Sequence, residues 1–92
     1  MSKRRSRLEI ILIILSAVRE GVDKPTRIMC AANMSWAPIK RLLSSLVEKG
    51  LVEERISHKS IQSRRRYLIT IKGANVLDYY EKAKEILPLN AL

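Results

Sequence analysis

The fold of this chain is decided by residues 25–50, which read PTRIMCAANMSWAPIKRLLSSLVEKG. Pro25 suits the first turn of a helix, because the backbone N–H that proline lacks would have no partner there. Asn33 tolerates the left-handed conformation that ends a short helix. Ser35 has the type of an N-cap residue, and a second helix should run from it to Gly50. Two helices joined by so short a turn predict a helix-turn-helix unit.

The residues on either side of this unit complete a larger pattern. A helix is expected before it, because Ser6 and Glu9 have the spacing of a capping box and Gly21 can end the helix. After the unit, the periodicity changes from helical to extended over 51–56 and 66–71, where β-branched and aromatic residues are frequent. A polar, cationic loop separates these two stretches, so a long hairpin is expected.

A last helix should begin at Thr70, an N-cap residue, and stop before Pro88. The order is then three helices, a strand, a loop, a strand and a helix. It predicts a mainly α fold with a small β-hairpin (α+β): a winged helix-turn-helix with an additional C-terminal helix. One domain is expected for a chain of this length. It would comprise a basic N-terminal arm over 1–6, the winged helix over 7–71, and a dimerisation helix with its tail over 72–92, together spanning 1–92.

The charge of the chain points to a polyanionic partner. Eighteen Lys and Arg residues oppose nine Asp and Glu residues among 92, a formal net charge of +9. Such a field attracts nucleic acid, an acidic protein or an anionic membrane. The longest apolar run, over 10–18, is far shorter than the roughly 20 residues that a membrane helix needs. We therefore expect no membrane partner and place the protein in the cytoplasm, at the nucleoid.

The helix over 36–49 is the predicted recognition helix. At 100° per residue, its apolar residues form one core face, and the opposite face is small and polar with two cations. Such a face can enter the major groove, where an arginine at position 41 can reach guanine O6 and N7. Trp36 either stacks on the DNA backbone or packs in the core, and its angle favours partial burial. The predicted contacts of this segment are Ser35, Trp36, Ala37, Lys40, Arg41 and Ser44.

Two further cationic stretches flank the recognition helix. The predicted wing, over 56–66, should touch the DNA backbone or minor groove, where arginine suits the negative potential. The arm should add phosphate contacts. The residues predicted to do so are His58, Lys59, Arg64 and Arg65 in the wing and Lys3, Arg4, Arg5 and Arg7 in the arm. A solvated cationic loop is the alternative for the wing.

The apolar residues of the first and last helices predict a homodimer. The first helix is apolar on two sides, and one side should meet either the last helix or another subunit. In the last helix, apolar residues are spaced four, three and four, as in a short coiled coil. The predicted interface consists of Ile10, Ile13, Ile14, Val76, Tyr80, Ala83 and Leu87. The competing view is that the last helix packs only on its own domain.

The segments 26–35, 46–52 and 67–73 resemble small archaeal winged-helix DNA-binding proteins of the chromatin-associated type, with a mass near the 10.6 kDa of this chain. The resemblance covers about 7–87. It implies DNA binding, a homodimer formed by a C-terminal helix, and an archaeal or archaeal-virus source. The chain departs from the family at Cys30, where an aromatic residue is common, in its shorter last helix, and in its longer, more basic wing.

Double-stranded DNA binding is therefore the function that the sequence predicts, either sequence-tolerant or operator-specific, for a transcription regulator or an architectural protein. The alternative is a protein–protein interaction module of the same fold with an acidic partner. RNA is less favoured, since only four aromatic residues are present. The single histidine and single cysteine fall in different elements, and no carboxylate pair or phosphate loop is visible. We therefore expect no enzyme activity, metal, cofactor or small-molecule ligand.

Overall fold

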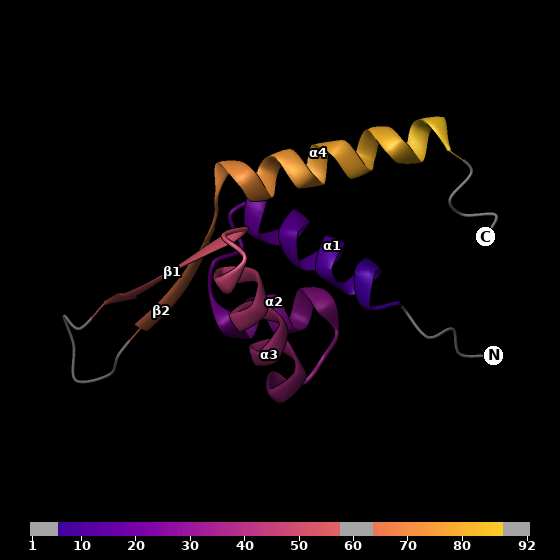
Figure 1. The fold of residues 1–92 in the computed structure, drawn as a ribbon. Coiled ribbons are helices and arrows are strands. Elements are labelled where there is room, and N and C mark those ends of the chain that lie inside the picture. The colour runs from indigo at the N-terminus through magenta and orange to yellow at the C-terminus, as the bar shows by residue number, and fades with distance from the viewer. Residues whose placement is uncertain (1–5, 58–63, 88–92) are drawn as a thin grey trace, which may run out of the picture.

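The computed structural model describes residues 6–57 and 64–87 and shows the element order that the sequence predicts (Figure 1). The helix α1 lies between α4 and the α2–α3 pair, and the hairpin projects from one side. No helix of the described ranges is long and apolar enough to cross a membrane. The elements are α1 (Arg7–Arg19), α2 (Pro25–Ala32), α3 (Trp36–Glu48), β1 (Val52–Ser57), β2 (Arg64–Ile69) and α4 (Ile71–Ile86).

Local chemistry sets the ends of the first three helices. The Ser6 hydroxyl accepts a hydrogen bond from the Glu9 backbone N–H at 3.0 Å, which caps α1 as predicted. Pro25 occupies the first turn of α2, and Asn33 ends it with φ 53° and ψ 51°, the left-handed region. Ser35 is the N-cap of α3 by position, but its side chain makes no capping hydrogen bond.

The two strands form an antiparallel hairpin and have the predicted length, but both are shifted toward the loop, to 52–57 and 64–69 from the predicted 51–56 and 66–71. Ser57 pairs with Arg64 at its outer end, so β2 begins two residues before the predicted start at Arg66. Arg64 and Arg65 therefore belong to the strand, because the exposed positions of a two-stranded sheet leave arginine side chains in solvent. At the hairpin root, the Tyr67 N–H donates to the Asp23 carbonyl at 2.9 Å and ties β2 to the α1–α2 connection.

The core lies where α1, α2, α3 and the hairpin root meet. Its fully buried side chains include Ile14, Leu15, Ile28, Ile39, Leu43 and Val52. The core face predicted for α3 is confirmed, since Ile39, Leu42, Leu43 and Leu46 are all buried.

The second apolar side of α1 was expected to meet either the last helix or another subunit, and α1 does contact α4 of its own domain. The place of Ile14 in a dimer interface is wrong. Ile14 has no exposed surface, although it was expected in a dimer interface, and Ile10 is partly buried against the same core. The physical reason is that α1 contacts α2, β2 and α4 of its own domain, and Ile14 belongs to the core that these elements share. Ile14 is therefore not available to a second copy.

The first turn of α4 is fixed to the connection between α3 and β1. The Thr70 hydroxyl accepts from the Gly73 N–H at 3.0 Å and donates to the Leu51 carbonyl at 3.0 Å. Lys72 Nζ donates to the Lys49 carbonyl at 2.9 Å. Gly73 is buried so close to this connection that a Cβ there would collide with the Leu51 carbonyl oxygen. The helix therefore starts from a defined position beside the C-terminal end of α3.

Most of α4 extends away from the core (Figure 1). Only Gly73 and Leu77 of this helix are buried. Large apolar side chains further along it are in solvent, with Tyr79 77% exposed and Ile86 79% exposed. A single helix with so little packing is marginal in water, so this half of α4 needs another surface to cover it.

Candidate nucleic-acid interface

The outward face of α3 is uncovered, as the angular analysis predicts. Ala37, Lys40, Arg41 and Ser44 are all exposed. Within residues 6–57 and 64–87, neither Lys40 nor Arg41 makes an ion pair with an acidic side chain. Two unneutralised cations beside short side chains form a face that a polyanion can approach closely. Trp36 is half-buried and packs against the core, which confirms the expectation of partial burial.

A second group of cations, missed by the sequence analysis, lies at the start of α2. Lys24 is the N-cap residue and Arg27 lies in the first turn, and both are exposed. No acidic residue occupies that turn. Cations at a helix N-terminus oppose the macrodipole, so this placement is unfavourable for the isolated helix. The sequence could have revealed this group, because two cations beside Pro25 stand at an unfavourable end of a predicted helix. A phosphate bound at this helix N-terminus would offset the unfavourable charge.

Most arginines in the described part of the hairpin are paired with acidic side chains, which the composition of the hairpin did not suggest. Arg55 Nε pairs with Glu53 at 2.8 Å on its own strand. Arg66 Nε lies 3.7 Å from the Asp23 carboxylate, on the α1–α2 connection. Arg65 Nη1 lies 4.0 Å from Glu54.

Of the four arginines in the described part of the hairpin, Arg64 is the one without an acidic partner among the described residues. The predicted excess of charge on the wing is therefore partly neutralised by acids from neighbouring segments. Surface pairs of this kind are weak, and the arginines can exchange their carboxylate partner for a phosphate.

The pair Tyr67 and Glu54 fixes one of these acids on the inner side of the hairpin. The two residues face each other across the strands, and the Tyr67 hydroxyl donates to Glu54 Oε2 at 2.7 Å. Burial, together with this hydrogen bond, raises the pKa of Tyr67 to about 12. The bond holds the Glu54 carboxylate beside Arg65 and away from the outer face.

Tyr67 should make the stability of the domain depend on alkaline pH. Its folded pKa of about 12 lies above the ordinary value of 10.0, so the folded state binds the proton more tightly. This contribution is fully present below about pH 10 and is lost as the pH rises toward about 12. Tyr67→Phe should lower the unfolding free energy by about 1 kcal/mol at neutral pH. It should also make the decline between about pH 10 and 12 shallower.

Urea unfolding at about pH 8 and about pH 11 measures both effects. Tyr79→Phe is the matched control, because Tyr79 is 77% exposed and its hydroxyl makes no hydrogen bond to another described residue. Equal pH dependence in the Tyr67→Phe variant and the wild type would contradict the assignment.

Several predicted contacts lie outside the described residues, namely Lys3, Arg4, Arg5, His58 and Lys59. Arg7 is described and is exposed at the start of α1, and Ser35 is exposed before α3. In the described part of the chain, no three His, Cys, Asp or Glu side chains are grouped so that they could hold a metal ion.

Comparison with known proteins agrees with this architecture. Residues 4–87 match the family model described as winged helix-turn-helix. An uncharacterised protein of Methanocaldococcus jannaschii is 35% identical over 51 residues, which are 55% of this chain and 53% of that protein. The chain thus spans about half the length of this relative.

Two solved structures of Lactococcus lactis ZitR share the fold. A point mutant of ZitR superposes with a TM-score of 0.69 at 18% identity, over 92% of this chain and 60% of that one. ZitR described as a zinc-responsive MarR family member gives a TM-score of 0.64 at 23% identity, over 98% and 60%. Because the family match covers nearly the whole chain, this protein belongs to the winged helix-turn-helix family, whose fold is typical of DNA binding and transcription regulation.

Proposed function

We propose that the protein binds double-stranded DNA as a homodimer, with α3 in the major groove and the wing on the backbone or minor groove. It would serve as a transcription regulator or an architectural protein. The observation that carries the proposal is the uncovered face of α3, where Lys40 and Arg41 are exposed without an acidic partner in the described residues.

The order of side chains along α3 suits insertion by its N-terminal half. Ala37 and Ser44 are short and exposed, so the helix axis can approach the base edges closely. Arg41 lies between them and has the reach and fork geometry for guanine O6 and N7. Glu48, exposed at the other end of the helix, would repel phosphates, so contact should fade toward that end.

Phosphate contacts would come from the cations around α3. Lys24 and Arg27 stand at the start of the helix that crosses the backbone in other helix-turn-helix proteins. Arg64 of the hairpin and Arg7 at the start of α1 would each add a charge that no acidic side chain of the described residues pairs with. These contacts would supply affinity with little dependence on base sequence.

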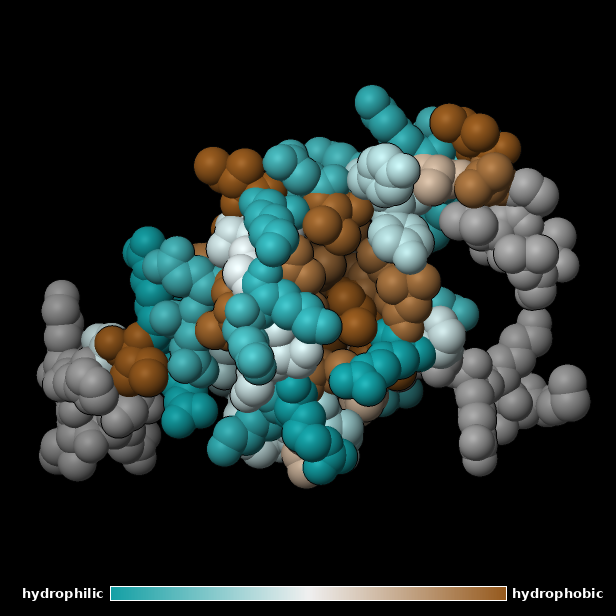
Figure 2. All heavy atoms as spheres, viewed as in Figure 1, coloured by the Kyte–Doolittle hydropathy of each residue, from teal (hydrophilic) through white to brown (hydrophobic). Residues whose placement is uncertain are grey.

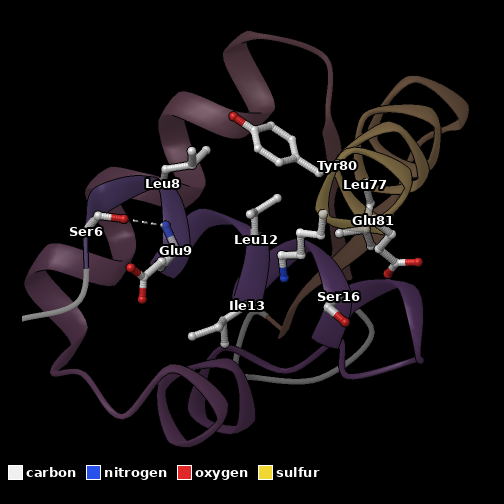
Figure 3. A pocket seen from close by; sticks show the side chains of 10 residues that line it. Ser6, Leu8, Glu9, Leu12, Ile13, Ser16, Leu77, Tyr80 and Glu81 are labelled. Atoms are coloured by element: carbon white, nitrogen blue, oxygen red, sulfur yellow. Dashed lines mark hydrogen bonds between the residues drawn. The ribbon is translucent and has the colours of Figure 1, made fainter. Parts of the chain in front are cut away.

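The homodimer is supported by a groove between α1 and α4, of about 600 Å³. Figure 2 shows hydrophobic side chains between these helices and at the far end of α4. In Figure 3, side chains of both helices line the groove, with Leu8 and Leu12 on α1 and Tyr80 on α4. The expected interface residues Ile13 and Tyr80 are both among the lining residues.

The occupant that fits the groove is α4 of a second copy. The apolar residues of α4 other than Leu77 that follow its first turn fall on one side of the helix at 100° per residue and so form a stripe, in which Tyr79, Ile86 and Leu87 are exposed and Val76, Tyr80 and Ala83 are half-buried. The outer part of this stripe is exposed, and the groove beside it mixes apolar side chains such as Leu8 and Leu12 with polar and charged ones. Glu9 and Lys84 also line the groove without pairing to each other, so a twofold arrangement offers each one an opposite charge.

Ile86→Lys should convert the dimer to a monomer while leaving the domain folded. Ile86 is 79% exposed in the single chain, so the charge costs nothing there but would be buried in the dimer. Ile71→Lys is the matched control, since Ile71 is 84% exposed and lies outside the stripe. Sedimentation of both variants and the wild type at tens of micromolar protein measures their oligomeric state. A wild-type monomer under these conditions would end the dimer proposal.

Duplex binding should depend steeply on salt. Each neutralised phosphate contributes about −0.9 to the slope of log K against log salt, so a dimer should give roughly −4 to −8. Gel shifts with duplex DNA, single-stranded DNA and RNA at several salt concentrations measure this slope and the preferred nucleic acid. A slope flatter than about −2 would rule out phosphate clamping. Absence of duplex binding at low salt would favour an interaction module with an acidic partner.

A further inference from the structure

Beyond its first turn, α4 is joined to α1 by the ion pairs of one side chain. Arg19, the last residue of α1, reaches two carboxylates of α4. Its Nη1 lies 2.7 Å from Asp78 Oδ1 and its Nη2 lies 2.8 Å from Glu81 Oε1. The two acids are three residues apart and so stand one turn above the other on the same face. A single guanidinium therefore pairs with two carboxylates that lie one turn apart on α4.

No other polar contact in the described residues joins α4 beyond Leu77 to the rest of the domain. Leu77 is the last buried residue of the helix. The groove between α1 and α4 continues past this point to Lys84 and would be filled by the second copy. Arg19 thus contacts α4 just past the last buried residue of that helix.

We infer that Arg19 is a positioning residue for DNA binding: it sets the angle of α4 to the winged helix and so the separation of the two recognition helices in the dimer. This inference rests on the proposed function. A tilt of about 10° at Leu77 moves the end of α4, about 14 Å further along, by about 2 Å. Because each subunit adds its own tilt, the separation would no longer match successive major grooves, which lie about 34 Å apart.

Loss of the Arg19 ion pairs should change the angle of α4 and leave the folding of the domain unchanged. All three side chains are partly in solvent, with 31% of the Arg19 side chain and 63% of the Asp78 side chain exposed. Ion pairs this exposed contribute little to folding stability, but a forked arginine with a carboxylate on each branch favours one relative orientation of the two helices. Loss of Arg19 should therefore leave a folded dimer whose α4 angle is poorly defined.

The test measures the distance between the two copies of α3 in the intact dimer. Spin labels are placed at Ser44→Cys, an exposed site on α3, after Cys30→Ser removes the single native cysteine. Pulsed dipolar spectroscopy should give one narrow distance distribution for the wild-type background. In Arg19→Ala, the distribution should become at least about twofold broader while sedimentation still shows a dimer, because a tilt of about 10° shifts the labels by ångströms.

A second variant separates geometry from charge. Asp78→Ala with Glu81→Ala removes the acceptors and makes the protein more positive, whereas Arg19→Ala makes it less positive. Both variants should broaden the distribution and both should lose the preference of the wild type for one half-site separation on duplex DNA. Glu20→Gln is the control, since Glu20 is exposed next to Arg19 and pairs with no cation in the described residues.

The outcomes are distinguishable. An unchanged narrow distribution in both variants overturns this inference and leaves the proposed function intact. A change in Arg19→Ala without one in the double variant also overturns it, because the effect would then follow charge. A wild type that gives no inter-subunit distance, or that does not bind duplex DNA, removes the proposed function and this inference with it.

Discussion

Gly73→Ala should destabilise the domain by about 3 kcal/mol, although alanine is the better helix former by about 1 kcal/mol. The added Cβ would collide with the Leu51 carbonyl oxygen and lie 2.9 Å from Ile69 Cδ1. The oxygen belongs to the backbone that already accepts hydrogen bonds from Thr70, so it cannot move without breaking them. The overlap therefore outweighs the gain in helix propensity.

The measurement is thermal and urea unfolding of the variant beside Gly21→Ala. At Gly21 a Cβ would meet nothing within 4 Å, but φ is +103°, so that control reports backbone strain without a collision. We expect about 1 kcal/mol for the control and a drop in Tm of more than about 10 °C for Gly73→Ala. A Gly73→Ala variant as stable as the wild type would show that the start of α4 can shift, and the defined position of this helix would have to be abandoned.

Arg41→Ala should weaken duplex binding by at least about 30-fold and relax base preference at one position of each half-site. A bidentate arginine–guanine contact is worth about 1–3 kcal/mol, and a dimer loses two of them. The side chain is exposed and unpaired with any acid in the described residues, so its loss should leave folding unchanged. Titration of a labelled duplex at fixed salt measures the change.

Lys82→Ala removes the same charge from α4, where Lys82 is exposed and away from α3, and serves as the control. It should change the affinity by less than about threefold, through the net charge only. Equal losses in the two variants would mean that binding responds to total charge, and α3 would then have no special role in recognition.

Local signals in the sequence were sufficient for the order of the elements and for most helix ends, but not for the ends of the strands. Pro25 and Asn33 act through backbone conformation, and Ser6 and Thr70 act through capping hydrogen bonds that span only three residues. Such signals need no knowledge of the tertiary structure. The exposed face of α3 was predictable for the same reason. The apolar residues of this helix lie on a single side, so the opposite side must be the exposed one.

The environment of α1 could not be predicted in this way. Its residues are apolar almost all round, so the pattern does not say which side faces the core. Whether Ile14 meets its own domain or another copy depends on where α2, β2 and α4 pack, and these are long-range contacts. Its neighbour Ile13, also expected in the interface, lines the groove between α1 and α4.

The neutralisation of the wing was hidden for a similar reason. Reading from Arg55 to Ile71 finds no acid, but Asp23 is brought to Arg66 by the hydrogen bond between β2 and the α1–α2 connection. Glu54 reaches Arg65 across the hairpin. Charge counted along the chain therefore overstates the charge that a surface presents, because the register of the strands decides which charges meet.

The half-anchored α4 has a consequence for how the protein would respond to its own abundance. When the second half of a helix is covered only by another copy, dilution exposes it, and its backbone amides should then exchange their hydrogens fastest in the domain. Occupancy of a paired operator would rise with the square of the protein concentration wherever monomers predominate. A small change in expression could thus switch such an operator more sharply than a monomeric protein would allow.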